Sequence, residues 1–191
     1  MVTSVTLSLR RQPEMRRFSA WYCADMASGF RAQREIVQQD WRPPVMRQYD
    51  ASEVARLFPD YVRDEQCLML LVHEGPAPRV DAEIHSVESI MTQLGLKAAD
   101  AKAAEGWMGH RNTVPEWRDL LEQGLIADTI EVSGTWSQIG AIYEDVVAAL
   151  KTVPDCVNAS AHSSHVYRSG INLYFTFACM PADASVTVSY T

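Results

Sequence analysis

The hydrophobic pattern of the chain changes its period several times along 191 residues. Alternation of apolar and polar residues is typical of a half-buried strand, and apolar residues at i, i+3 and i+4 are typical of an amphipathic helix. The segment Cys67–His73 is apolar without a break, which predicts a central strand that is buried on both faces. The other predicted strands span residues 2–9, 17–23, 45–49, 126–132 and 156–164, followed by a hairpin that ends at 178 and an edge strand at 184–190.

Helical spacing alternates with these strands. The predicted helices span residues 26–39, 52–58, 78–94, 98–109, 116–123 and 136–152. Asp25 and Ser52 are expected to cap the first two helices by accepting hydrogen bonds from backbone N–H groups. Ser133 or Thr135 is expected to do the same for the last helix, and Gly95 is expected just beyond the third.

Two stretches repeat one strand-helix-strand plan. They are Arg17–His73 and Ile126–Phe177, and the second ends in the hairpin. Such segments predict an α+β fold, with a mostly antiparallel sheet and helices on one face, built from two ferredoxin-like β-α-β(β) halves. The length fits a single domain with a sizeable core.

The hairpin contains the densest group of candidate functional residues. Its polar members are His162, His165, Tyr167, Asn172, Tyr174 and Thr176, and an Arg-Ser-Gly turn lies between its strands. Alternation predicts that His162 or His165 lies with Tyr167, Tyr174 and Thr176 on one face, opposite the apolar side chains. These groups can carry protons, which favours a site on a rigid support. An ordinary half-buried strand pair remains the alternative, because exposed Tyr and Thr suit any pleated sheet.

Charge and composition exclude several classes of protein. The net charge of -7 argues against a nucleic-acid binder, and no apolar run approaches the about 20 residues of a membrane span. The N-terminal residues have no apolar core before a cleavage site, so they do not resemble a signal peptide. The four scattered cysteines favour reduced thiols over disulfides or a zinc site. We therefore expect a cytoplasmic protein.

The hairpin also carries a resemblance. The run H-x-S-H-x-Y-x-x-G-x-x-L-Y-F-T-F, from His162 to Phe177, resembles the C-terminal cap domain of FAD-linked oxidases, in particular the alkyldihydroxyacetonephosphate synthase (alkylglycerone-phosphate synthase) branch and its bacterial relatives. Three further segments are similar to this family. They are Trp107–Arg111 (W-x-x-x-R), Trp117-Arg118-Asp119, and Glu131–Trp136 (E-x-x-x-x-W). The segment Arg47–Asp50 matches the family's R-L-x-D with two departures.

The resemblance implies roles for individual residues. Tyr174 matches the tyrosine proposed as the acid/base of the synthases, and a phenol needs a cationic or histidine neighbour to serve as a base near neutral pH. Arg118, Arg47, His162 and His165 are the implied substrate-binding residues, and the implied substrate is a small phosphate- or carboxylate-bearing compound. Related metal-dependent oxidases have His where this chain has Tyr174, so no metal site is expected.

Two alternatives for the arginines stay open at this point. Arg47 could form a surface ion pair with Asp50, and Arg118 could pair with Asp119 or Glu122. An arginine that is held in such an ion pair would not be available to bind the substrate.

The resemblance also implies a domain organisation. Residues 1–14 are similar to the junction strand that follows the family's FAD-binding domain, 15–178 would be the cap or substrate domain, and 179–191 a divergent tail. The full-length family uses FAD, but no G-x-G-x-x-G or P-loop occurs here. We therefore expect a substrate-binding cap that binds no FAD alone and is inactive without an FAD-binding domain or subunit. A stand-alone, non-catalytic binding or assembly module that retains the cap fold is the alternative. The separated cap is expected to expose apolar surface, through which it can associate as a homodimer, whereas a stand-alone module is expected to have a closed surface or form a symmetric dimer.

Overall fold

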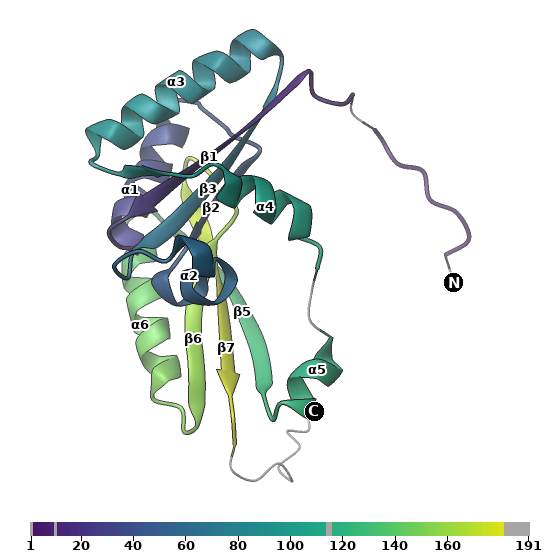
Figure 1. The fold of residues 1–191 in the computed structure, drawn as a ribbon, viewed down its shortest axis with the longest axis vertical. Helices are drawn as coiled ribbons and strands as arrows, with labels where there is room; N and C mark the ends of the chain where they lie inside the picture. The colour runs from purple at the N-terminus through teal and green to yellow at the C-terminus, as the bar shows by residue number, and fades with distance from the viewer. Residues whose placement is uncertain (1, 10, 114–115, 182–191) are drawn as a thin grey trace.

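A seven-stranded antiparallel sheet forms the centre of the computed structural model, which describes residues 2–9, 11–113 and 116–181. Figure 1 shows the strands in the order β4-β1-β3-β2-β6-β7-β5. The strands are β1 (Met15–Cys23), β2 (Val45–Tyr49), β3 (Cys67–Gly75), β4 (Lys97–Ala99), β5 (Ile126–Thr135), β6 (Cys156–Ser163) and β7 (Gly170–Cys179). The helices are α1 (Met26–Gln38), α2 (Ala51–Leu57), α3 (Ala77–Gln93), α4 (Lys102–His110), α5 (Trp117–Glu122) and α6 (Ile139–Lys151), with a 3₁₀ turn, η1, at Pro59–Tyr61.

Two halves meet in the middle of this sheet. Strands β4, β1, β3 and β2 form one half, and β6, β7 and β5 form the other. The halves are joined by a short antiparallel pairing of β2 with β6, in which Gln48 lies opposite Ser163 and Tyr49 opposite His162. The predicted α+β fold with an antiparallel sheet is confirmed.

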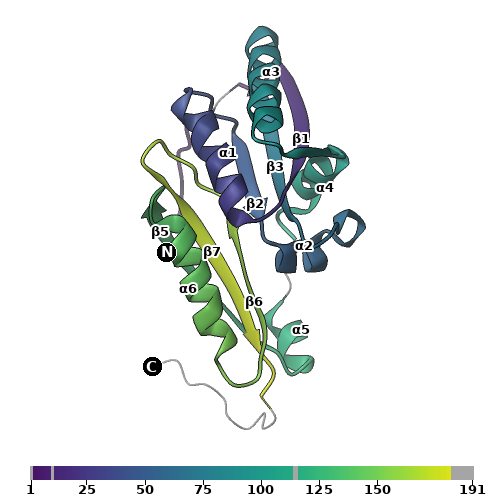
Figure 2. The same cartoon turned by 90° about the vertical axis from the view of Figure 1, so that its left-hand side faces the viewer.

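The long helices cover one face of the sheet. Helices α1, α3 and α6 lie on the left in Figure 1 and in front of the sheet in Figure 2. They pack on alternate residues of the strands, such as Met69 and Leu71 of β3 and Phe175 of β7. The prediction that helices cover one face of the sheet is therefore confirmed for the three long helices.

Two short helices lie on the opposite face of the first half. Helices α2 and α4 pack on Leu68 and Leu70 through Val54, Ala103 and Ala104. This second layer is the reason that β3 is buried on both faces, as its unbroken apolar sequence predicts.

The predicted strand at residues 2–9 is wrong. These residues form no strand with any other part of the described chain, and their large apolar side chains are exposed. Alternation suits a sheet edge, but an isolated segment has no backbone partner to complete the ladder. The predicted edge strand at 184–190 lies outside the described residues.

Several predicted helix ends change. Asp25 caps α1 as predicted, and it forms a capping box with Ser28. Asp50, rather than Ser52, caps α2, because its carboxylate reaches the backbone N–H of Glu53. Residues 97–99 form the short edge strand β4 before α4 begins.

The last predicted cap is also wrong. Ser133 and Thr135 belong to β5, which pairs with β7 along its whole length, so α6 begins only at Ile139 and has no side-chain cap. The strand ladder supplies backbone partners that a helix start at 136 would break.

Candidate active site

A row of rings crosses the junction of the two halves. Antiparallel register places Tyr49 of β2 opposite His162 of β6, and His162 opposite Tyr174 of β7. The ring centroids of Tyr49 and His162 lie 5.2 Å apart, and those of His162 and Tyr174 also lie 5.2 Å apart with a 25° angle between planes. The row lies on the face turned away from α6, because Ala161 and Phe175, its strand neighbours, enter the helix-covered core.

The open face continues across β7 and β5 with polar side chains. Tyr174 lies opposite Glu131, and its hydroxyl donates a hydrogen bond to Thr129 Oγ1 at 3.0 Å. Thr129 and Glu131 are exposed, and Tyr174 and Thr176 are half-buried. The prediction that a histidine, Tyr174 and Thr176 share one face is thus confirmed, and the histidine is His162.

A buried carboxylate holds His162. Glu53 of α2 is 1% exposed, and its Oε2 lies 2.8 Å from His162 Nδ1. Its other oxygen accepts a 3.4 Å hydrogen bond from Arg56 and a 3.3 Å bond from the Thr176 hydroxyl. Charged groups are seldom buried unless they are paired in this way.

Asp50 fixes the helix that carries Glu53. Its carboxylate accepts hydrogen bonds from the backbone N–H groups of Glu53 at 2.9 Å and Ala161 at 2.7 Å, and from the Tyr143 hydroxyl at 3.2 Å. Burial raises the pKa of Asp50, although the two backbone hydrogen bonds oppose this effect. One side chain therefore ties α2 to β6 and α6, on both sides of the sheet.

A cavity of 570 Å³ lies beside this row, between β2, α2, η1 and α4. Arg47 projects into it, with its guanidinium carbon 5.5 Å from the Tyr49 ring centre and 5.3 Å from that of Trp107. The Arg47 Nε is buried and has no hydrogen-bond partner among the described residues. His162 also lines this cavity. Burial raises the pKa of Tyr49 to about 12, so its phenol stays protonated near neutral pH.

The alternative pairing of Arg47 with Asp50 is wrong. Asp50 binds backbone N–H groups and Tyr143 instead, and its side chain is not among the groups that line the cavity. Arg47 is stacked on aromatic rings, a contact that guanidinium groups favour.

The structure separates the other predicted site residues from this row. His165 lies in the β6–β7 connection with its side chain 64% exposed, and its ring is 3.7 Å from Glu131. Tyr167 lies in the same connection and is exposed. Arg118 is exposed on α5, outside the cavity of Arg47, and forms no ion pair with another described residue. The alternative pairing of Arg118 with Asp119 or Glu122 is therefore not formed.

Two members of the site escape sequence reasoning. Glu53 lies 109 residues before His162, and nothing local marks it as a partner. Trp107 carries a signal, since it opens the W-x-x-x-R segment, but its stacking on Arg47 depends on the docking of α4.

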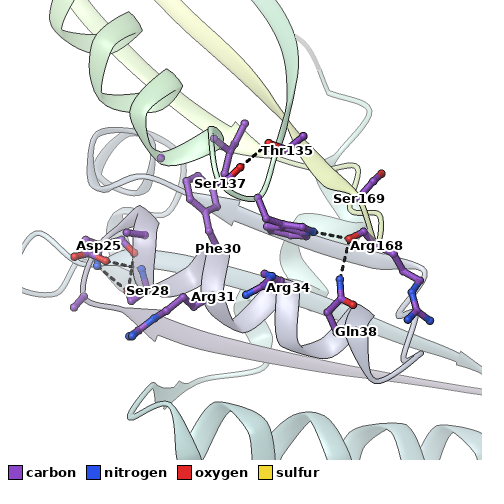
Figure 3. Close-up of a pocket in the computed structure, with 15 residues that line it drawn as sticks. Asp25, Ser28, Phe30, Arg31, Arg34, Gln38, Thr135, Ser137, Arg168 and Ser169 are labelled. Carbon is purple, nitrogen blue, oxygen red and sulfur yellow. Dashed lines mark hydrogen bonds between the residues drawn. The ribbon is translucent and has the colours of Figure 1, made fainter.

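A larger groove of 950 Å³ lies on the helix-covered face, between α1 and the start of α6. Figure 3 shows Gln38 of α1 reaching Arg168 across this groove, with Arg31 and Arg34 on the same helix and Ser137 on the other side. Gln38 and Trp136 both donate hydrogen bonds to the Arg168 carbonyl, which closes one end. None of the predicted site residues lines this groove.

Within the part of the chain that the structure describes, no three His, Cys, Asp or Glu side chains are grouped so that they could hold a metal ion. Over the same residues, no helix is both long and apolar enough to cross a membrane.

Comparisons with known proteins agree with the sequence resemblance. The family model "FAD linked oxidases, C-terminal domain" matches residues 12–188. The uncharacterized FAD-linked oxidoreductase YgcU of Escherichia coli strain K12 is 30% identical over 187 residues, which cover 92% of this chain and 38% of that protein. The alkyldihydroxyacetonephosphate synthase of Dictyostelium discoideum is 23% identical over 212 residues, covering 93% of this chain and 34% of the synthase. The chain thus spans well under half the length of these relatives.

Solved structures share the fold. An alkyldihydroxyacetonephosphate synthase superimposes with a TM-score of 0.76 at 23% identity, over 91% of this chain and 37% of that one. A 4-ethylphenol oxidase from Gulosibacter chungangensis gives a TM-score of 0.64 at 10% identity, over 91% and 41% of the two chains. The fold is therefore kept where the sequences have diverged widely.

Proposed function

Because this chain belongs to the FAD-linked oxidases, as their C-terminal domain, we propose that it forms the substrate-binding part of an FAD-dependent oxidoreductase. Residues 15–178 would be this domain, and residues 1–14 the connection to an FAD-binding domain. Exposed Trp117 and Leu121 on α5 support a partner surface, since large apolar side chains seldom lie side by side in water.

The cavity of Arg47 carries this proposal. The half-buried side chain of Arg47 lines this cavity, so its guanidinium group can donate to an anionic oxygen there, and partial burial strengthens such an interaction. Several relatives are named for alkyldihydroxyacetonephosphate, which bears a phosphate ester. We assign Arg47 the phosphate or carboxylate of the substrate, and the stacked pair of His162 and Tyr174 its proton transfer. Arg118 and His165 stay predictions as further substrate contacts.

FAD, when bound, supplies the redox chemistry of this family. The described residues fit the substrate side of such a site, because imidazole, phenol and hydroxyl groups line the open face beside Arg47. They do not supply a glycine-rich cradle for the pyrophosphate of FAD. We therefore assign FAD binding to a domain or subunit outside these residues.

Calorimetric titration with dihydroxyacetone phosphate tests the substrate assignment. The Arg47→Gln substitution should weaken binding about 10- to 100-fold, as expected for loss of a charged hydrogen-bond donor. Arg31→Gln is the matched control, because Arg31 lines the groove on the other face. Equal affinity of the wild type and Arg47→Gln, or a loss in Arg31→Gln, would exclude the cavity as the substrate site.

Gel filtration after mixing the chain with FAD tests the cofactor assignment. The flavin should elute separately from the protein, as judged by its absorbance. Co-elution of about one flavin per chain would mean that these residues hold FAD themselves, and the division of the site proposed here would be wrong.

A further inference from the structure

The hydrogen bond between Glu53 and His162 limits how the imidazole can carry its proton. A carboxylate is an acceptor, so the 2.8 Å contact with Oε2 requires a hydrogen on Nδ1. Two further donors, Arg56 and the Thr176 hydroxyl, lie at the other oxygen of Glu53, so both oxygens of this side chain act as acceptors. Neutral His162 bound in this way has no hydrogen on Nε2.

The Nε2 atom is the one ring nitrogen of His162 that remains available. It has no hydrogen-bond partner among the described residues, and the ring that carries it lines the cavity of Arg47. Among the described residues, the side-chain nitrogen and oxygen atoms that are both buried and without a partner do not include Nε2 of His162. This nitrogen is therefore accessible from outside the protein. A substrate held by Arg47 would therefore meet an unprotonated nitrogen.

We propose that Glu53 is a positioning residue, which holds His162 as the Nδ1–H tautomer so that Nε2 is the proton-accepting atom of the site. This inference rests on the proposed function, in which the cavity of Arg47 receives the substrate. A proton that leaves the substrate passes to Nε2, and the electron pair of the broken bond stays on the substrate. The imidazolium so formed lies beside the Glu53 carboxylate, which stabilises its charge.

Tyr174 has a different part in this arrangement. Its hydroxyl hydrogen is directed to Thr129 Oγ1, towards β5, so the phenol already donates a hydrogen bond to another residue. Its ring stacks on His162, where an aromatic face stabilises a cation. The sequence motif favours the tyrosine as the acid/base, whereas the geometry assigns proton acceptance to the histidine beside it.

Charged and titratable groups from five elements surround His162 or line its cavity. They are Arg47 and Tyr49 of β2, Glu53 and Arg56 of α2, Asp60 and Tyr61 of η1, Tyr174 of β7, and Lys102 and His110 of α4, with Arg111 just beyond α4. Among them, Glu53 is the group bonded to an imidazole nitrogen of His162, which is why we assign the choice of tautomer to it.

Nitrogen NMR of the histidine rings tests the inference on the chain as it is. With ¹⁵N-labelled histidine and pH high enough to keep the rings neutral, long-range ¹H–¹⁵N spectra show which ring nitrogen carries hydrogen. The chain has five histidines, so a His162→Gln variant identifies the resonance. We expect His162 as the Nδ1–H tautomer, the opposite of the preference of free histidine. An Nε2–H tautomer of His162 in the wild type would overturn the inference.

Two variants then show whether Glu53 is the cause. Glu53→Ala should return His162 to the Nε2–H tautomer. Glu131→Ala is the matched control, because Glu131 lies 3.7 Å from the other histidine of the hairpin, His165. An unchanged tautomer in folded Glu53→Ala would overturn the role of Glu53. If Glu53→Ala does not fold, Glu53→Gln replaces it, and the expected result is a mixture of tautomers.

Adding dihydroxyacetone phosphate separates this inference from the proposed function. If both hold, the Nε2 resonance of His162 shifts more than the Nδ1 resonance. If the Nδ1–H tautomer depends on Glu53 but the phosphate compound changes neither resonance, the role of Glu53 stands and the cavity as substrate site is excluded.

Discussion

The two halves of the sheet follow one plan but differ on the face turned away from the long helices. In the first half, this face is covered by α2 and α4, and Leu68 and Leu70 of β3 are buried beneath them. In the second half, the same face carries Tyr174, Thr176 and Thr129, which are half-buried or exposed. One half therefore buries both faces of its strands, and the other buries one face and leaves polar side chains accessible on the other.

The candidate site lies where these two uses meet. Tyr49 and Arg47 come from the edge of the covered half, and His162 and Tyr174 from the open half. Helix α2 packs apolar residues on β3 and at the same time brings Glu53 to His162. The comparison suggests that the covered half acts as a rigid support for the groups of the open half.

On the face turned away from the long helices, loss of side-chain volume should have the largest effect in the covered half. Leu70 is fully buried under α4, so Leu70→Ala should lower the free energy of unfolding by about 2–5 kcal/mol. Thr129→Ala on the open half should change it by no more than about 0.5 kcal/mol. Urea unfolding followed by circular dichroism measures both, and equal losses would mean that the open face is also part of the core.

The helices of the two halves should differ in their tolerance of a methyl group. A Cβ at Gly29 of α1 would lie 2.2 Å from the Gln48 amide, which is buried and bonded to Gln33. Gly29→Ala should therefore destabilise by about 1–3 kcal/mol. Gly140, at the start of α6, has nothing within 4 Å of such a Cβ. Gly140→Ala should be neutral or slightly stabilising in the same unfolding experiment; a loss equal to that of Gly29→Ala would contradict the close approach at α1.

The junction between the halves should respond to pH. Burial raises the pKa of Asp50 above its ordinary value of 3.8, so the folded state binds its proton more tightly than the unfolded state does. This contribution is fully present below pH 3.8 and is lost as the pH rises through the raised pKa. The stability difference between the wild type and Asp50→Asn should decrease over that interval. A constant difference would mean that the backbone hydrogen bonds balance burial, and a difference that grows with pH would mean that they outweigh it.

Alkylation of the cysteines compares how accessible the two halves are, and of these experiments it should have the smallest effect on stability. Each half holds one pair of directly opposed cysteines, Cys23 with Cys67 and Cys156 with Cys179. The first pair is buried, which raises the pKa of the Cys67 thiol to about 12, and the second pair is half-exposed. Iodoacetamide should modify the second pair long before the first, as mass spectrometry of timed digests would show. Early modification of Cys67 would mean that the covered half opens readily.

The fold follows from the sequence where local pattern and tertiary contacts agree. Asp25 precedes a clear helical spacing, and the apolar run Cys67–His73 has the length of a strand, so α1 and β3 are predicted well. Residues 2–9 mislead, because alternation describes a strand but does not provide it with a partner.

The site is less predictable for a physical reason. The alternation around the hairpin leaves His162 and His165 as equal candidates until the strand register is fixed, since a change in register moves side chains between environments. The contact with Glu53 depends on the docking of α2 over a distance of 109 residues in sequence. Sequence pattern therefore identifies the hairpin and its tyrosine, and the structure is needed to choose the histidine and find its carboxylate.

The most direct test of the central claim, that the open face beside Arg47 receives the substrate, uses two tryptophans as reporters. Trp107 stacks on Arg47 in the cavity, and Trp136 lines the larger groove on the helix-covered face. Indole ¹H–¹⁵N spectra recorded during titration with dihydroxyacetone phosphate should show the Trp107 resonance shifting in a saturable way while that of Trp136 stays constant. A saturable shift of Trp136 with Trp107 unchanged would move the binding site to the opposite face and contradict this account.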